Sequence, residues 1–293
     1  MAEALIDRQF LERLERLTIH WQKSFPGLVG GHNASRFSGA GQEFLDHRSF
    51  HQGDDLRAVN WRAYMRLERL ILKMFQVEPR VPIRFLVDCS ASMTTGEKNK
   101  FDYARKLVAA LTYVGLVRLE TILIQPFADK LLDPIAVGGG RHRFQPVAEF
   151  LTAIQPAGKT DFMAVSRRFL AEYPQRGLLI IVSDFLDDRE AEKPIQYLSD
   201  FGHELFLIHL WSDEDRCPPW TGELEVEDAE TGKMAKMDFD EESRESYTQA
   251  FDNYAAAVRQ MAFRKGGKYV GVPTSTAVEE AIFGPMMLAR GVF

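Results

Sequence analysis

From residue 81 onward the sequence alternates short apolar runs with longer segments whose apolar residues recur every three or four positions. The first pattern is typical of buried strands and the second of helices that cover a sheet, so their alternation predicts repeated βαβ units. Strands are expected at 83–88, 121–127, 178–183, 205–211 and 268–272, and helices at 101–119, 144–154, 161–173, 194–201, 241–263 and 276–288. The predicted fold class is therefore α/β, with a mostly parallel sheet that carries helices on both faces. Residues 178–183 are expected at its centre, because strands covered on both faces are unbroken aliphatic runs, and 131–137 as an antiparallel edge.

The remaining segments divide the chain into two regions. Residues 7–24 have the spacing of an amphipathic helix, whereas residues 27–75 are rich in Gly, Ser, Asn, Asp and Arg and predict turns and short strands. We therefore expect an N-terminal region at 1–78 and the α/β domain at 79–293. Within that domain, residues 222–239 alternate in polarity around a glycine-containing turn, which predicts an inserted, solvent-facing β-hairpin.

Composition limits the classes of partner and the compartment. The chain has 45% hydrophobic and 27% charged residues, as is usual for globular proteins, and its formal charge of −6 argues against a nucleic-acid-binding face. Two distant cysteines allow neither a disulfide framework nor a cysteine zinc cage. The acidic N-terminus is unlike a signal peptide, and the longest apolar runs are far shorter than the ~20 residues that span a bilayer. We therefore expect a cytoplasmic protein without a membrane span.

Oxygen-bearing side chains follow two of the predicted strands. In an extended chain Asp88, Ser90 and Ser92 point to the same side, since successive side chains alternate. Asp184 ends the other strongly apolar strand, and Thr160 lies at a helix start shortly before it. In open α/β sheets ligands bind beyond the carboxyl ends of the strands, at the point where the strand order reverses. These five residues are thus expected to meet at one crevice.

Carboxylates and hydroxyls without His or Cys form a hard-oxygen ligand set. Such a set suits Mg²⁺ or Mn²⁺ and disfavours zinc, and Ca²⁺ fits less well because few carboxylates are present. Two acidic side chains balance a divalent ion, and the neutral hydroxyls leave it open to a carboxylate from a partner protein. The pattern therefore indicates a non-enzymatic binding device.

The same residues resemble a known site. The run Asp-Cys-Ser-Ala-Ser at 88–92, followed by Thr160 and Asp184, is similar to the metal-ion-dependent adhesion site of von Willebrand factor type A domains. The resemblance extends over about residues 81–210. It implies that Ser90 and Ser92 ligate the metal directly, and that Thr160, Asp88 or Asp184 does so directly or through water.

Other interpretations use the same residues. Each of them is common alone as a turn, cap or strand-end residue. A phosphate loop ending at Gly158-Lys159-Thr160 would need glycine where Ala153 stands. A phosphoryl-accepting aspartate of the haloacid-dehalogenase type would need a second aspartate in place of Ser90. A metal-dependent hydrolase or phosphatase that uses the same crevice remains the alternative function.

A second motif lies in the N-terminal region. Residues 39–50 and 53–61, with Gly41, Gly53, Asp54 and Trp61, resemble the signature of bacterial domain-of-unknown-function family number fifty-eight, in which it precedes a von Willebrand A segment. Together with the hairpin sequence at 228–232, the resemblance covers nearly the whole chain. Members of that family are commonly encoded beside MoxR-type AAA+ ATPases. The resemblance therefore implies an adaptor or chaperone-like partner of such an ATPase, with a client protein that supplies an acidic side chain to the metal.

Overall fold

The computed structural model describes residues 5–20, 43–52, 54, 56, 59–76, 81–187 and 192–293. Contacts divide the chain into two units, one of residues 1–23 with 82–293 and one of residues 24–81. This division differs from the sequence-based one mainly at the N-terminus, because the first helix groups with the larger unit. No helix among the described residues is long and apolar enough to cross a membrane.

The larger unit is built on one six-stranded sheet of order β10-β7-β6-β3-β4-β5. Its strands are β3 (Ile83–Asp88), β4 (Thr121–Phe127), β5 (Ile135–Gly138), β6 (Leu178–Ser183), β7 (Glu204–Trp211) and β10 (Lys268–Pro273). Every neighbouring pair is parallel except β4 with β5. The predicted α/β class, the antiparallel edge and the central place of residues 178–183 are thus confirmed.

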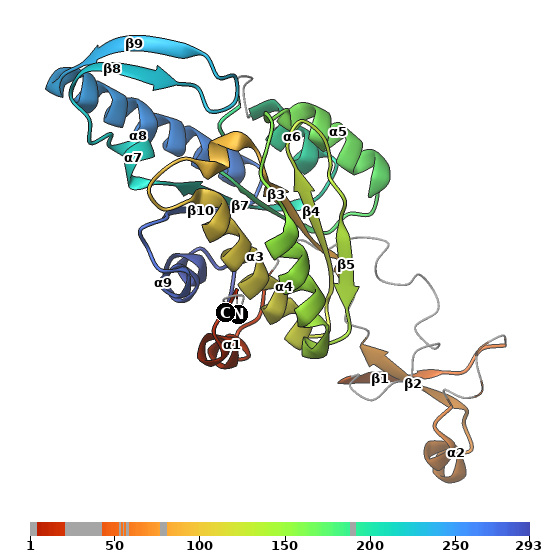
Figure 1. Cartoon of the computed structure of the whole chain (residues 1–293). Helices are drawn as coiled ribbons and strands as arrows, with labels where there is room; N and C mark the ends of the chain where they lie inside the picture. Colours follow the sequence, from red (N-terminus) through yellow and green to blue (C-terminus); the bar gives the residue numbers. More distant parts are fainter. Residues whose placement is uncertain are drawn as a thin grey trace. The chain divides into compact units, whose positions relative to one another are not determined.

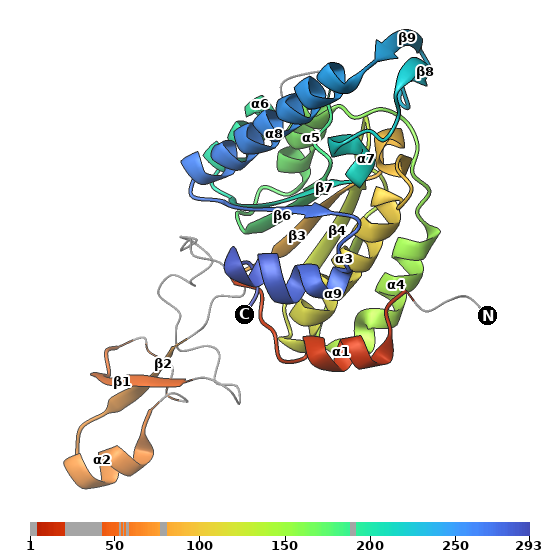
Figure 2. The same cartoon turned by 90° about the vertical axis from the view of Figure 1, so that its left-hand side faces the viewer.

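Helices cover both faces of this sheet (Figures 1 and 2). One face carries α5 (Phe162–Glu172), α6 (Glu192–Asp200) and α8 (Glu241–Arg264), and the other carries α1 (Arg8–Leu14), α3 (Lys100–Val117), α4 (Phe144–Ala153) and α9 (Val278–Ala281). The predicted helix at 276–288 is not a single α-helix. It continues from α9 as a π-helical segment at Ile282–Met286, which contains Pro285 and therefore lacks one amide donor.

The strand order creates a switch point between β3 and β6. From β3 the chain crosses through α3 to β4 on one side, and later returns to the other side of β3 as β6. All six residues of β3 and all six of β6 are buried, since helices lie on both faces. The carboxyl ends of these two strands therefore lie side by side at the same edge of the sheet.

Helix α1 is shorter than the predicted helix at 7–24. It ends at Leu14, and the chain then forms a bridge from Ile19 to Val292. Leu14 is fully buried, the Tyr113 hydroxyl donates to the Glu15 carboxylate at 2.9 Å, and Arg118 Nε donates to the Leu17 carbonyl at 3.1 Å. These contacts with α3 explain why the N-terminal helix belongs to the larger unit.

Replacing Leu14 with alanine is expected to lower the free energy of unfolding of the larger unit by about 2 to 5 kcal/mol, because it leaves a cavity under α1. Urea denaturation followed by circular dichroism measures this change. The matched control is Leu11→Ala on the same helix, since Leu11 is only partly buried. Equal small losses in both variants would show that α1 does not pack on this unit.

The hairpin predicted at 222–239 is present as β8 (Gly222–Glu227) and β9 (Met234–Phe239), which pair antiparallel. At its turn Asp228 Oδ1 accepts from the amides of Glu230 and Thr231 at 3.1 and 2.5 Å. Gly232 takes a φ of +66°, which favours glycine. These features fix the shape of the hairpin tip.

The smaller unit contains β1 (Glu43–Ser49), α2 (Trp61–Leu67) and β2 (Ile71–Gln76), and β1 pairs antiparallel with β2. Arg48 forms a two-pronged ion pair with Asp54 at 2.7 and 2.8 Å. The side chain of Trp61 is 52% exposed and meets Tyr64 edge to face. Residues 39–42, 53, 55, 57 and 58 of the N-terminal motif lie outside the described part.

Candidate metal centre

The ends of β3 and β6 bring the two predicted carboxylates together. Val87 is in register with Val182, so Asp88, the last residue of β3, and Asp184, the residue after β6, lie at the ends of neighbouring strands. Both side chains are almost completely buried, and the Ser183 hydroxyl donates to Asp88 Oδ2 at 2.6 Å. The expected meeting of two strand-end aspartates is thus seen in the structure.

Ser90 and Ser92 converge on the same point by two different local geometries. Ser90 is extended, with φ −67° and ψ 166°, and its amide donates to Asp88 Oδ1 at 2.9 Å. Ser92 instead lies in a 3-10 helix, η2 (Ala91–Thr94), whose turn brings its Oγ to 2.9 Å from Ser90 Oγ. Strand alternation therefore accounts for Asp88 and Ser90 but not for Ser92. Cys89 is buried and its thiol faces the Val87 carbonyl at 3.3 Å.

Thr160 lies on the loop beside these residues. The Ala91 amide donates to the Gly158 carbonyl at 2.9 Å, and the Ala157 amide donates to the Cys89 carbonyl at 2.8 Å, so this loop and the Asp88–Ser92 loop run side by side. The Thr160 hydroxyl and amide face the two carboxylate oxygens of Glu230, on the hairpin tip, at 3.4 and 3.5 Å. No hydrogen bond joins Thr160 to the serines or aspartates of the site in the described structure. Thr160 therefore borders the network of the other four residues.

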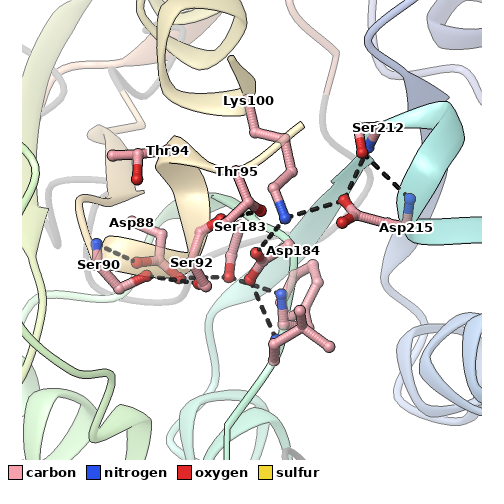
Figure 3. A network of polar contacts seen from close by, with 12 residues as sticks. Asp88, Ser90, Ser92, Thr94, Thr95, Lys100, Ser183, Asp184, Ser212 and Asp215 are labelled. Atoms are coloured by element: carbon pink, nitrogen blue, oxygen red, sulfur yellow. Dashed lines mark hydrogen bonds and ion pairs between the residues drawn. The ribbon is translucent and has the colours of Figure 1, made fainter. Parts of the chain in front are cut away.

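A lysine that the sequence did not single out lies inside this network. Lys100 begins α3 with a fully buried side chain, and its Nζ is 2.8 Å from Asp184 Oδ2 and 2.9 Å from Asp215 Oδ2 (Figure 3). Asp215 in turn closes a capping box with Ser212, which follows the end of β7. Three adjacent strands thus contribute to one polar cluster. The spacing of Lys100 with the buried residues Ala104, Leu107 and Leu111 could have revealed that it lies on the core-facing stripe of its helix.

Burial and mutual repulsion govern the protonation of these groups. Burial, with repulsion from Asp184, raises the pKa of Asp88 to about 7, although hydrogen bonds from Ser183 and Ser90 oppose the shift. Burial alone would lower the pKa of Lys100, but Asp184 and Asp215 raise it above its ordinary value, so the ammonium stays charged. Burial also raises the pKa of the Cys89 thiol, which disfavours a nucleophilic role.

The charge of the cluster and the spacing of its two serine oxygens are compatible with a divalent cation. Asp88, Asp184 and Asp215 against the single ammonium of Lys100 leave a formal charge of −2 when all are ionised. Adjacent corners of an octahedron with bonds of about 2.1 Å are about 3.0 Å apart, close to the 2.9 Å between the two serine oxygens. Within the described ranges no three His, Cys, Asp or Glu side chains group to hold a metal. An ion here would therefore rely on hydroxyl and water oxygens as well as carboxylates.

The histidine near the cluster is poorly suited to act as a general base for the serines. His209 is the nearby imidazole, but it is buried and its Nδ1 lies 3.0 Å from the Tyr269 hydroxyl. Burial, with repulsion from Lys100, lowers the pKa of His209 to about 3, so the ring is neutral and poorly suited to take a proton.

The chain is similar to a known protein family, to bacterial proteins and to several solved structures. The family model described as "Protein of unknown function DUF58" matches residues 46–257. Uncharacterized proteins of Mycobacterium bovis and Mycobacterium tuberculosis are each 25% identical over 259 residues, which cover 86% of this chain and 81% of the relative. Among solved structures, the conserved hypothetical protein BatB from Bacteroides thetaiotaomicron is 16% identical with a TM-score of 0.43, over 71% of this chain and 98% of that chain. The manganese-loaded TRAP protein of Plasmodium vivax is 14% identical with a TM-score of 0.40, over 73% and 74%.

Proposed function

This chain belongs to the DUF58 family of proteins of unknown function, and we propose that it acts as a non-enzymatic, divalent-metal-dependent protein-binding module. The observation that carries the proposal is the pair of serine oxygens 2.9 Å apart beside the buried Asp88 and Asp184. Mg²⁺, or Mn²⁺, would be held by Ser90, Ser92 and Asp88, with Asp184 and Thr160 as further ligands directly or through water. The bound ion would supply an electrophilic position for a carboxylate of the partner protein.

The hydrogen bonds of the site's carboxylates support the proposed ion binding. Both oxygens of Asp88 accept hydrogen bonds, one from the Ser90 amide and one from Ser183, and each oxygen retains a second lone pair. Lys100 and the Leu186 amide engage Asp184 in the same manner. With His209 neutral and tied to Tyr269, these contacts support a binding function over a hydrolase or phosphatase.

The partner follows from the family resemblance together with the chemistry of the site. The resemblance supports a MoxR-type AAA+ ATPase, for which this chain would be an adaptor or chaperone-like partner. The need for an outside carboxylate supports a client protein that presents an Asp or Glu side chain to the ion.

The test is a titration of the full chain with Mg²⁺ by calorimetry, together with melting curves in Mg²⁺ and in EDTA. We expect saturable binding and a higher Tm in Mg²⁺, because a ligand that binds only the folded state stabilises it. Absence of heat together with identical melting curves would exclude the metal-dependent function. Metal-dependent turnover of generic phosphoesters, lost in Asp88→Ala, would favour the phosphatase alternative.

The hairpin already places one carboxylate of this chain near the crevice. Glu230 reaches Thr160 with both oxygens, and the Asp228 turn holds it there. Replacing Glu230 with glutamine is expected to raise the affinity of the Mg²⁺-loaded protein for an Asp-containing peptide, because a competing negative charge is lost. The gain should be at most about fivefold, since a partly exposed charged contact contributes about 1 kcal/mol or less.

Calorimetry with acetyl-Gly-Asp-Gly-amide in Mg²⁺ measures this gain. Glu227→Gln is the matched control, because Glu227 is an exposed residue of the same hairpin. An unchanged or lower affinity in Glu230→Gln would show that Glu230 does not compete with an incoming carboxylate.

A further inference from the structure

A cleft of about 820 Å³ lies beside the candidate metal centre, bounded by the loop after η2, by α7 (Asp213–Arg216), by the β8–β9 hairpin and by α8. Its volume falls within the range of about 300 to 1,000 Å³ that is usual for ligand sites. The hairpin forms one wall through Leu224, Val226 and Met237, and α8 contributes Tyr247. The proposed metal function makes no use of this cleft.

The walls of the cleft expose large apolar side chains. Trp220 is 51% exposed, and Met237 and Tyr247 are each 43% exposed, although all three line the same hollow. Phe239 packs edge to face on Tyr247 at 6.3 Å and supports this wall from within. Apolar side chains gathered around a hollow indicate a surface that another molecule covers.

The charged residues of the cleft all have one sign. Four acidic residues border it, Glu97, Glu214, Asp215 and Asp238, and no Lys, Arg or His does. Asp238 alternates with the cleft-facing Met237 and Phe239, so its side chain points to the other face of the hairpin. Asp215 is paired with Lys100. Within the described residues no ion pair joins the other three to a cation. The cleft therefore combines apolar walls with an uncompensated negative field, which attracts a cationic ligand with apolar side chains.

The cleft borders the candidate metal centre. Thr95, which lines the cleft, donates through its hydroxyl to the Ser92 carbonyl at 2.7 Å. Asp215 lines the cleft and also holds Lys100, which contacts Asp184. A partner segment that presents a carboxylate to the metal would thus have its neighbouring residues next to the cleft.

We propose that this cleft binds a segment of the partner protein in which a Lys or Arg stands beside a large apolar side chain. The apolar side chain packs on Trp220, Met237 and Tyr247, and the cation faces Glu97 and Glu214. The assignment of the segment to the same partner that supplies the carboxylate rests on the proposed metal function. The recognition of the basic, apolar segment itself does not require the metal.

The test uses the full chain and the peptide acetyl-Phe-Arg-Leu-Lys-amide, measured by calorimetry and by tryptophan fluorescence in Mg²⁺ and in EDTA. We expect saturable binding in both buffers. Binding should be weakened at least about tenfold in Trp220→Ala and in the double variant Glu97→Gln with Glu214→Gln, since losing a central aromatic contact or two facing charges weakens binding by such factors. Glu225→Gln is the matched control, because Glu225 is exposed on β8 between the cleft-lining Leu224 and Val226 and points to the other face. This variant should bind as the unaltered chain does.

Three results would overturn the proposal. The first is equal binding of acetyl-Phe-Glu-Leu-Glu-amide, which would show that the negative field is irrelevant. The second is binding of the basic peptide unchanged in Trp220→Ala and in the double variant. The third is self-association of the chain in sedimentation runs that Trp220→Ala abolishes, which would make a second copy the occupant. Peptide binding in EDTA without any heat from Mg²⁺ would instead leave this inference standing and remove the metal function.

Discussion

Replacing Lys100 with methionine is expected to lower the free energy of unfolding by about 3 to 5 kcal/mol, because it leaves buried carboxylates without their cation. The Lys100 side chain is fully buried, and its Nζ contacts Asp184 at 2.8 Å and Asp215 at 2.9 Å. Methionine keeps much of the volume of the lysine side chain, so the change isolates the charge from the packing. Urea denaturation in EDTA gives the size of the loss.

Mg²⁺ should restore part of that stability, since a divalent ion supplies positive charge beside Asp184. Repeating the denaturation in Mg²⁺ measures the recovery, which should be larger in Lys100→Met than in the unaltered chain. Lys106→Met is the matched control, because Lys106 is an exposed residue of the same helix. Equal losses in the two variants, or a loss that Mg²⁺ does not reduce, would contradict a shared role of Lys100 and the ion in balancing the cluster.

The second large effect concerns Asp184. Replacing it with asparagine is expected to weaken Mg²⁺ binding at least about 100-fold, since even outer partners of a metal ligand contribute 10- to 100-fold. Asparagine retains the shape of the side chain and an oxygen that can accept from the Leu186 amide, which now donates to Asp184 at 3.1 Å. What is lost is the negative charge that faces both Lys100 and the crevice.

Calorimetry with Mg²⁺ and capture of the acetyl-Gly-Asp-Gly-amide probe measure this loss. Asp213→Asn serves as the control, because Asp213 lies near the same end of the sheet but is exposed and bonds to Ser275 at 2.9 Å. Unaltered metal affinity in Asp184→Asn would place the ion elsewhere. Unaltered probe capture without metal binding would separate peptide recognition from the ion.

The sheet could be predicted from the sequence because its strands are buried on both faces. The run at 178–183 is apolar except for its last residue, and the run at 83–88 is apolar except for Arg84 and Asp88. The structure places both at the centre of the sheet. Adjacent central strands then bring Asp88 and Asp184 together at their carboxyl ends. The local run of apolar residues was sufficient to predict where each strand ends, and therefore that both aspartates lie at strand ends.

The rest of the site depends on contacts that no local pattern contains. Ser92 reaches Ser90 through a 3-10 turn rather than through strand alternation. Lys100 interrupts an apolar stripe. Its role in the site depends on ion pairs with Asp184 and Asp215, which lie far away in the sequence. The position of Glu230 over Thr160 depends on where an inserted hairpin folds back. Long-range packing decided each of these features.

The central position of β3 has a consequence for how the chain is made. The hydrogen bond between Asp88 and Ser183 spans 95 positions, and the ion pair of Lys100 with Asp184 spans 84. During synthesis on the ribosome, β3 and β4 emerge before β6. One edge of β3 therefore stays unpaired until β6 has been translated. Contacts between such distant positions form late in folding. The two buried aspartates therefore meet only after more than half of the protein has left the exit tunnel, and Lys100 obtains its second partner only when α7 has followed.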